Sequence, residues 1–195
     1  MTKNDESWKK IFREYDILYH VEREGSFKIS AAQIKKFREP RLMTKFDHKI
    51  NLPTIFLENN LSILPITRGD YIISHFKTWH DFEPITSFII PTTLPEHLQS
   101  LNAKNIFSET VALNCALTSG IIADFTGDEN IFPTVSGRMS SGNFVFKISD
   151  TTKNFLHEVS VNNSQIEIDA AFEGINFLTL IEAKNDLSDD FLIRQ

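Results

Sequence analysis

Two acids and a lysine late in the sequence are of the residue types that hydrolyse phosphodiesters. They are Asp169, Glu182 and Lys184. Carboxylates are hard oxygen ligands for Mg²⁺, and the bound ion activates water and neutralises charge on a phosphate. A lysine beside the ion can orient the attacking water or stabilise the charge of the transition state. We therefore expect Mg²⁺, as one ion or two, with Asp169 and Glu182 as metal ligands and Lys184 as a catalytic residue.

Alternating polar and apolar residues predict the two strands that would bring these side chains together. In residues 165–172 polar side chains, Asp169 among them, alternate with isoleucines. The segment 177–184 places Glu182 and Lys184 on one face, roughly 7 Å apart along the strand. A turn between the two strands would form an antiparallel hairpin with Asp169 beside Glu182. The alternative is that Glu182 and Lys184 form a surface pair that contributes at most about 1 kcal/mol.

This arrangement resembles the signature of the PD-(D/E)xK nuclease superfamily. Twelve residues separate Asp169 from Glu182-Ala183-Lys184, the common E-A-K form, and Ile168 stands where the superfamily has proline. From Ser108 onward the chain resembles type II restriction endonucleases. The resemblance implies a restriction-endonuclease-like core and an Mg²⁺-dependent endonuclease acting on double-stranded DNA, and it allows a homodimer. It also implies a further catalytic acid on the helix before the strands, a role that Glu109 matches by position.

Other elements are expected around this hairpin. Apolar spacing predicts one buried helix over residues 109–125, after Ser108 as N-cap. Residues 136–142 read as a loop that is either merely flexible or binds a DNA phosphate through Arg138. The acids that follow Lys184 predict a further helix, with Ser188 as its N-cap. Because the nuclease core normally continues beyond this point, the sequence is expected to be part of a longer enzyme.

The N-terminal part reads as short helices followed by a strand. A capping box at residues 30–33 predicts a helix that runs through Phe37, and Pro53 marks another helix start. Residues 67–70 form a turn before a strand at 71–73. This order predicts a small helical, winged-helix-like module, with a structural or protein-binding role as the alternative.

We expect an α+β or α/β protein with three parts, a DNA-binding or accessory domain, a connector and a nuclease core that is incomplete at its C-terminus. Their ranges are residues 1–85, 86–107 and 108–195.

Charge is unevenly distributed along the sequence. Residues 1–85 hold 14 basic and 12 acidic residues, whereas residues 86–195 hold 6 and 14, within a net charge of −6. Seven basic residues and only two acids lie between Lys28 and Lys49, and this basic stripe is expected to contact DNA phosphates. Its four candidates are Lys35, Lys36, Arg38 and Arg41. The alternative is an ordinary solvated helix face.

Composition excludes several other classes of protein. No apolar run is long enough to span a membrane, the N-terminus lacks the apolar core of a secretory signal, and Cys115 has no second cysteine to pair with. We therefore expect a cytoplasmic protein without a membrane partner. Two rival functions remain open. One is a DNA-binding regulator whose C-terminal part dimerises, and the other is an inactive nuclease-like structural module.

Overall fold

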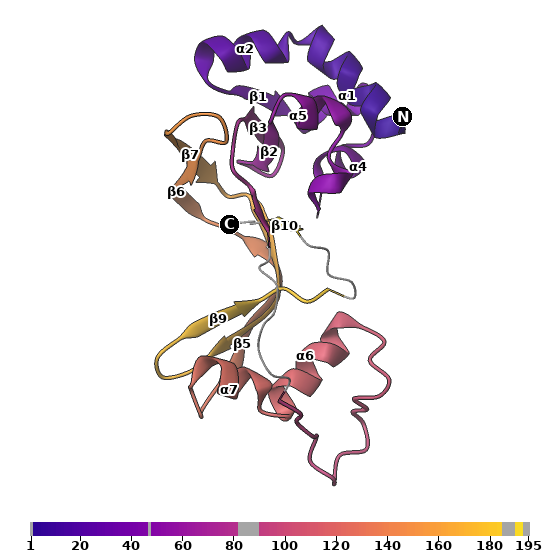
Figure 1. Ribbon diagram of the computed structural model, residues 1–195, viewed down its shortest axis with the longest axis vertical. Coiled ribbons are helices and arrows are strands. Elements are labelled where there is room, and N and C mark those ends of the chain that lie inside the picture. The colour runs from indigo at the N-terminus through magenta and orange to yellow at the C-terminus, as the bar shows by residue number, and fades with distance from the viewer. Residues whose placement is uncertain (1, 47, 82–89, 185–189, 193–195) are drawn as a thin grey trace. The chain divides into compact units, whose positions relative to one another are not determined.

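The computed structural model describes residues 2–46, 48–81, 90–184 and 190–192, which form a mixed α and β structure (Figure 1). The chain divides into two compact units. Unit 1 comprises the described residues within Met1–Phe82, Ser140–Gln165 and Ser188–Gln195, and unit 2 those within Glu83–Met139 and Ile166–Leu187. The chain therefore passes from one unit to the other repeatedly, because a segment from the middle of the C-terminal half belongs to unit 1.

Unit 1 begins with helices that pack on a three-stranded antiparallel sheet, whose strand order is β1-β3-β2. Its N-terminal elements are α1 (Lys3–Glu14), α2 (Ile17–Glu24), β1 (Phe27–Ser30), α3 (Ala31–Lys35), α4 (Pro40–Thr44), η1 (Lys49–Asn51), α5 (Thr54–Glu58), β2 (Ser62–Pro65), β3 (Asp70–Ser74) and β4 (Trp79–Asp81).

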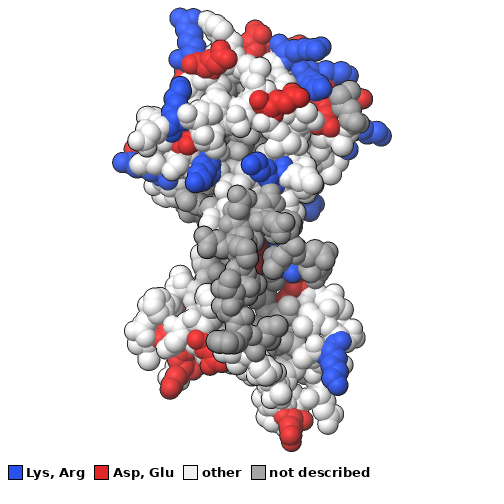
Figure 2. All heavy atoms as spheres, viewed as in Figure 1, with Lys and Arg blue, Asp and Glu red and all other residues white. Residues whose placement is uncertain are grey.

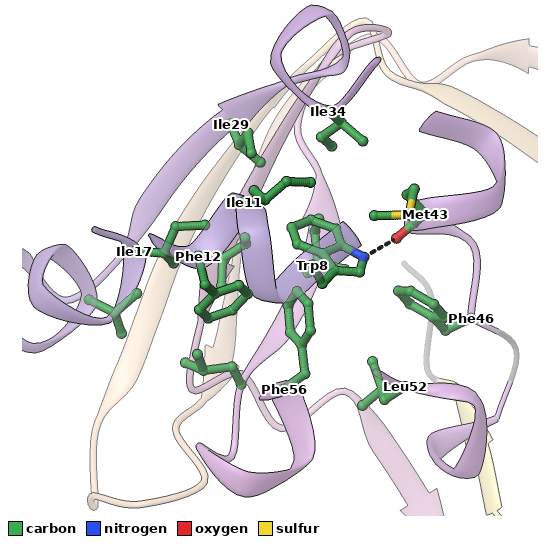
Figure 3. Packing of buried hydrophobic residues seen from close by; sticks show 14 residues of the cluster. Trp8, Ile11, Phe12, Ile17, Ile29, Ile34, Met43, Phe46, Leu52 and Phe56 are labelled. Atoms are coloured by element: carbon green, nitrogen blue, oxygen red, sulfur yellow. Dashed lines mark hydrogen bonds between the residues drawn. The ribbon is translucent and has the colours of Figure 1, made fainter. Parts of the chain in front are cut away.

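The core of unit 1 surrounds Trp8 (Figure 3). Trp8, Phe12 and Phe56 are buried and meet edge to face, with ring centroids 4.8–6.0 Å apart. The indole N–H of Trp8 donates to the carbonyl oxygen of Met43 at 2.9 Å, so its one polar group is satisfied inside the core. These contacts join α1, α4 and α5 against one face of the sheet.

Side-chain caps fix the starts of two helices of unit 1, α1 and α3. The capping box expected at Ser30 and Gln33 is confirmed, although α3 ends at Lys35 rather than at Phe37. Because the residue before a proline is disfavoured in a helix, Glu39-Pro40 predicts that this helix ends before Pro40, which is confirmed. Pro40 itself begins α4, where its missing N–H costs nothing. The strand expected at residues 71–73 is confirmed as part of β3.

The carboxylate of Asp5 accepts hydrogen bonds at the N-terminal ends of two helices, α1 and α5. Its Oδ2 accepts hydrogen bonds from the N–H and hydroxyl of Thr2, at 2.7 and 2.9 Å. Its Oδ1 accepts from the N–H and hydroxyl of Thr54, at 2.8 and 3.2 Å. Burial raises the pKa of Asp5, but the hydrogen bonds from Thr54 and Thr2 outweigh it and hold the pKa at about 2. One buried carboxylate therefore couples the start of α1 to the start of α5.

A hairpin from the C-terminal half covers the sheet of unit 1. The hairpin consists of β6 (Asn143–Ser149) and β7 (Leu156–Asn162), which pair antiparallel. Phe144, Phe146 and Ile148 alternate in the sequence with Val145 and Lys147, a pattern that predicts a strand, and β6 confirms it. Its side chains form a second core with residues of β2, β3 and the segments that follow them. The buried members of this core are Leu64, Ile66, Ile72, Phe76, Val159 and Val161.

Unit 2 is a three-stranded sheet with two helices. Its elements are α6 (Glu109–Thr118), α7 (Ile121–Thr126), β5 (Phe132–Ser140), β8 (Gln165–Glu173) and β9 (Leu178–Ile181), and the strand order is β5-β8-β9. The helices lie along one face of the sheet (Figure 1). Leu113 and Ile122 of the helices pack there against Ala170 and Phe172 of β8.

Two expected elements of unit 2 have different bounds in the structure. The single helix expected over residues 109–125 is wrong, because the chain forms two helices that are interrupted at Gly120. Gly120 has φ +83°, a left-handed conformation that glycine adopts without strain. The loop expected at residues 136–142 is also wrong for residues 136–140, because these belong to strand β5.

The helix expected after Ser188 is not formed at the positions that the structure describes there. Asp190–Leu192 is instead a short strand, β10, which pairs antiparallel with β4 in unit 1. Ser188 itself lies outside the described residues. The acids in this segment therefore do not mark the first turn of a helix at residues 190–192.

Candidate active site

The β8–β9 hairpin positions the candidate catalytic residues. The two expected strands are confirmed as antiparallel neighbours, with Ala170 opposite Ile181 as the last pair toward the open end of the hairpin. Asp169 and Glu182 are the next residues beyond that pair. Strand β9 ends at Ile181, so Glu182 and Lys184 follow it in irregular backbone instead of belonging to it as expected.

The closed end of the hairpin is held by Asp128, which is 3% exposed. Its carboxylate accepts hydrogen bonds from the N–H and side-chain amide of Asn176 and from the N–H of Phe177. A Cβ at Gly174 would stand 2.4 Å from Oδ2 of Asp128, so glycine is the residue that leaves room for this contact. Asp128 thereby fixes the turn that joins the two strands carrying the site.

One oxygen of Asp169 is held by a hydrogen bond from the segment that follows β9. Its Oδ2 accepts a hydrogen bond from the N–H of Ala183 at 2.8 Å. Ala183 stands between Glu182 and Lys184 in the sequence, so this bond ties β8 to the segment that carries the other two candidates. Asp169 therefore both faces and helps to position the E-A-K segment.

Lys184 is paired directly with Glu182. Its Nζ lies 2.5 Å from Oε1 of Glu182, and its side chain is 23% exposed. Burial lowers the pKa of Lys184, but the hydrogen bond to Glu182 and the charges of Glu182, Asp169 and Glu109 outweigh it, so the pKa lies above its ordinary value. Lys184 is therefore a protonated ammonium at neutral pH and cannot act there as a general base.

Glu109 enters the same electrostatic neighbourhood from the helix that precedes the sheet. It is the first residue of α6, and Ser108 caps that helix by accepting a hydrogen bond from the N–H of Val111 at 3.3 Å. The charge of Glu109 acts on Lys184 together with those of Asp169 and Glu182. The four residues expected from the sequence thus share one electrostatic neighbourhood within unit 2.

The donor set of this cluster suits a hard divalent cation. It offers three carboxylates and no sulfur or imidazole ligand, which is the chemistry that Mg²⁺ prefers. Within the described part of the chain, no three acids, histidines or cysteines are grouped closely enough to hold an ion as they stand. Because one oxygen of Asp169 is fixed by Ala183 and Glu182 is paired with Lys184, cation binding would require the carboxylates to rearrange.

Arg138 lies on strand β5 and not in a loop, which corrects the expected setting of this residue. Its Nε forms an ion pair with Oε1 of Glu167 at 3.1 Å, and the two side chains are 60% and 49% exposed. Glu167 precedes Asp169 by two positions on β8 and therefore points to the same face of the strand. Arg138 is thus held on the sheet that carries Asp169.

The other candidates for DNA contact lie in unit 1. Lys35 is the last residue of α3, Lys36 follows it, and Arg41 lies on α4. All three are exposed, and Arg38 is half-buried. Basic side chains are spread over the helical part of unit 1 on the face drawn in Figure 2.

Two residues that shape the site were not singled out by sequence reasoning. Asp128 read as one of several polar residues in a turn, and nothing in its spacing indicates that it would reach the hairpin 48 residues later. Glu167 alternates with Asp169 and so was placed on the correct face, but its pairing with Arg138 depends on β5 being a strand. Both contacts join segments that are distant in the sequence.

Comparison with known proteins gives matches to two family models. No curated protein and no solved structure matches the chain. Among the described residues, no helix has both the length and the apolar character needed to cross a membrane. A family model described as Domain of unknown function (DUF6996) matches residues 5–73. A second model covers residues 74–195, more than half of the chain, and the chain therefore belongs to the family described as Domain of unknown function (DUF6997).

Proposed function

We propose that the chain is an Mg²⁺-dependent endonuclease that hydrolyses phosphodiester bonds of double-stranded DNA. The observation that carries this proposal is the convergence of charge on Lys184. The three acids expected for the site, Glu109, Asp169 and Glu182, all act on that one ammonium, although they come from a helix and from both sides of a hairpin. A surface pair of Glu182 and Lys184 alone would not require the other two acids to lie near it.

The residues divide the chemical work according to their charge. Asp169 and Glu182 would hold the ion, and Glu109 could complete its ligands. Bound there, the ion would activate a water and neutralise charge on the phosphate. Lys184, as an ammonium, would orient that water or stabilise the charge that develops on the phosphate oxygens.

The charge of unit 2 makes a cation necessary for this function. The sequence spans of unit 2 contain three basic and eleven acidic residues. Such a surface repels a polyanion, and the repulsion is strongest at the acids that would have to approach the scissile phosphate. A divalent ion at Asp169 and Glu182 would reverse the sign of charge at that point. Cutting should therefore depend on the ion both for chemistry and for approach.

The basic residues of unit 1 would hold the DNA backbone. The order of helices and strands and the β1-β3-β2 sheet agree with a winged-helix-like module. The helix before its β2–β3 hairpin is α5, whose sequence TIFLE contains no lysine or arginine. We therefore assign phosphate contact to Lys35, Lys36, Arg38 and Arg41 and no base reading to α5. Binding by unit 1 alone should be insensitive to sequence.

Cleavage and binding measured separately test this proposal. Plasmid cutting with Mg²⁺ should fall at least about 100-fold in Asp169→Asn, Glu182→Gln and Lys184→Met. DNA affinity measured without divalent ions should be retained or rise in the two acid variants, because each loses a negative charge near the phosphate. Glu173→Gln is the matched control, since it removes an exposed acid from the same hairpin and should cut at the parent rate.

The outcomes separate the proposed function from its rivals. If the chain cuts and all three site variants cut at the parent rate, the active site lies elsewhere. Binding without Mg²⁺-dependent cutting, with a salt slope that falls by about one unit for each of the four basic residues removed, would favour a DNA-binding regulator. Absence of both activities would favour a structural module.

A further inference from the structure

Lys184 already holds one of the carboxylates that the proposed site needs. Its ammonium is 2.5 Å from Oε1 of Glu182, and the pair is only partly exposed, with side chains 23% and 43% accessible. Asp169 is meanwhile engaged through one oxygen by the N–H of Ala183. In this arrangement the oxygen of Glu182 that faces Lys184 is not available to a metal ion.

The acids near Lys184 carry more charge than one ammonium neutralises. Glu109, Asp169 and Glu182 bring three negative charges to a neighbourhood with a single positive one. Three carboxylates in one neighbourhood repel one another, and a nearby cation reduces that repulsion. In the protein without metal, the lysine supplies this cation. A divalent ion would supply twice the charge, but the ammonium would repel it.

We propose that Lys184 is the built-in counter-ion of this site and must release Glu182 when a divalent ion binds. This inference rests on the proposed function and adds a mode of regulation to it. The exchange moves the ammonium off the carboxylate, and so makes its three N–H donors available to the attacking water or the phosphate. Ion loading and positioning of Lys184 are then one coupled event, and the lysine lowers the affinity of its own site for metal.

Mn²⁺ binding to the whole chain, without DNA, tests the exchange directly. The free Mn²⁺ signal in electron paramagnetic resonance is titrated with protein at fixed ionic strength and neutral pH. Lys184→Met should bind Mn²⁺ about tenfold more tightly than the parent, because a positive charge and a competitor for Glu182 are both removed. Lys184→Arg keeps the charge and should stay close to the parent.

Lys147→Met is the matched control, because Lys147 is an exposed lysine on β6 in the other unit and its loss changes net charge equally. Equal Mn²⁺ affinity in the parent and Lys184→Met, with binding lost in Asp169→Asn, would overturn the counter-ion role and leave the metal site standing. No Mn²⁺ binding by any variant, or binding unchanged by Asp169→Asn, would overturn the metal site and this inference together. Circular dichroism of each variant establishes that it is folded.

Discussion

Phe56 in unit 1 and Phe125 in unit 2 are the same residue type in opposite surroundings. Phe56 is fully buried between Trp8 and Phe12, whereas Phe125 at the end of α7 is 84% exposed. The two units differ in the same way in how far their apolar side chains are exposed. The core of unit 1 excludes water from a large set of aromatic and aliphatic side chains, while Leu178 and Leu180 on β9 are 57% and 61% exposed.

This difference separates stability from chemistry within one chain. Unit 1 has two apolar cores, one on each face of its sheet, so its geometry is set by packing. The sheet of unit 2 is covered by helices on one face, and the hairpin that bears Asp169 and Glu182 is fixed by the polar contacts of Asp128 and Ala183. Substitutions should therefore act through lost burial in unit 1 and through lost polar contacts in unit 2.

The largest expected effect comes from exchanging the two phenylalanines for alanine. Phe56→Ala should lower the free energy of unfolding of unit 1 by about 4 kcal/mol, because it leaves a cavity beside Trp8. Phe125→Ala should change stability by less than about 0.5 kcal/mol. Urea unfolding followed by far-ultraviolet circular dichroism reports on both units, whereas tryptophan fluorescence follows unit 1 alone, because Trp8 and Trp79 both lie there. Equal losses in the two variants would contradict the comparison.

A smaller effect is expected at the turn of the catalytic hairpin. Gly174→Ala should destabilise the hairpin by about 1–3 kcal/mol, because its Cβ would overlap the Asp128 carboxylate. Hydrogen exchange of backbone amides in β8 and β9 would then accelerate. Gly69→Ala is the control, because a Cβ there meets nothing within 4 Å. The idea fails if the two substitutions give the same exchange rates in the hairpin.

These expectations also mark what the sequence could predict. Local signals sufficed for the capping box at Ser30, for β3, for β6 and for the β8–β9 hairpin, because periodicity and turn residues act over a few positions. They failed at residues 109–125, where Gly120 turns the chain within an apolar pattern. They failed again at residues 190–192, where pairing with β4 outweighs the preference of aspartate for a helix start.

In the candidate site, too, local sequence signals predicted the elements but not the contacts between distant segments. Strand alternation predicted that Asp169 lies on β8, next to Ala170, the residue that pairs with Ile181. The resemblance predicted that Glu109 lies on a preceding helix. The hydrogen bond from Ala183 to Asp169 and the pairing of Lys184 with Glu182 depend on β9 ending at Ile181. A strand running on to Lys184, as expected, would have held both side chains further apart.

A third effect, similar in size to that at Gly174, concerns the charge that Asp5 carries in unit 1. The pKa of Asp5 is about 2 in the folded chain and about 3.8 when unperturbed, so its ionised form stabilises the fold by about 2 kcal/mol. This stabilisation is present in full above about pH 5 and is lost progressively as the pH falls through both pKa values to about pH 1. Asp5→Asn should therefore be less stable than the parent at pH 7, and the gap should narrow steadily as the pH falls toward 2. Urea unfolding at several pH values measures the difference, and a gap independent of pH would contradict the assignment.

The docking of the β6–β7 hairpin onto unit 1 has a consequence for biosynthesis. Leu64, Ile66 and Ile72 leave the ribosome well before Val159 and Val161, which complete their core. At ordinary translation rates the delay is on the order of 10 s. During that interval the nascent chain presents one apolar sheet face to solvent, where it is a binding site for chaperones and a risk for aggregation. Slower translation of the region around residue 100 should lengthen this exposure and lower the yield of folded protein.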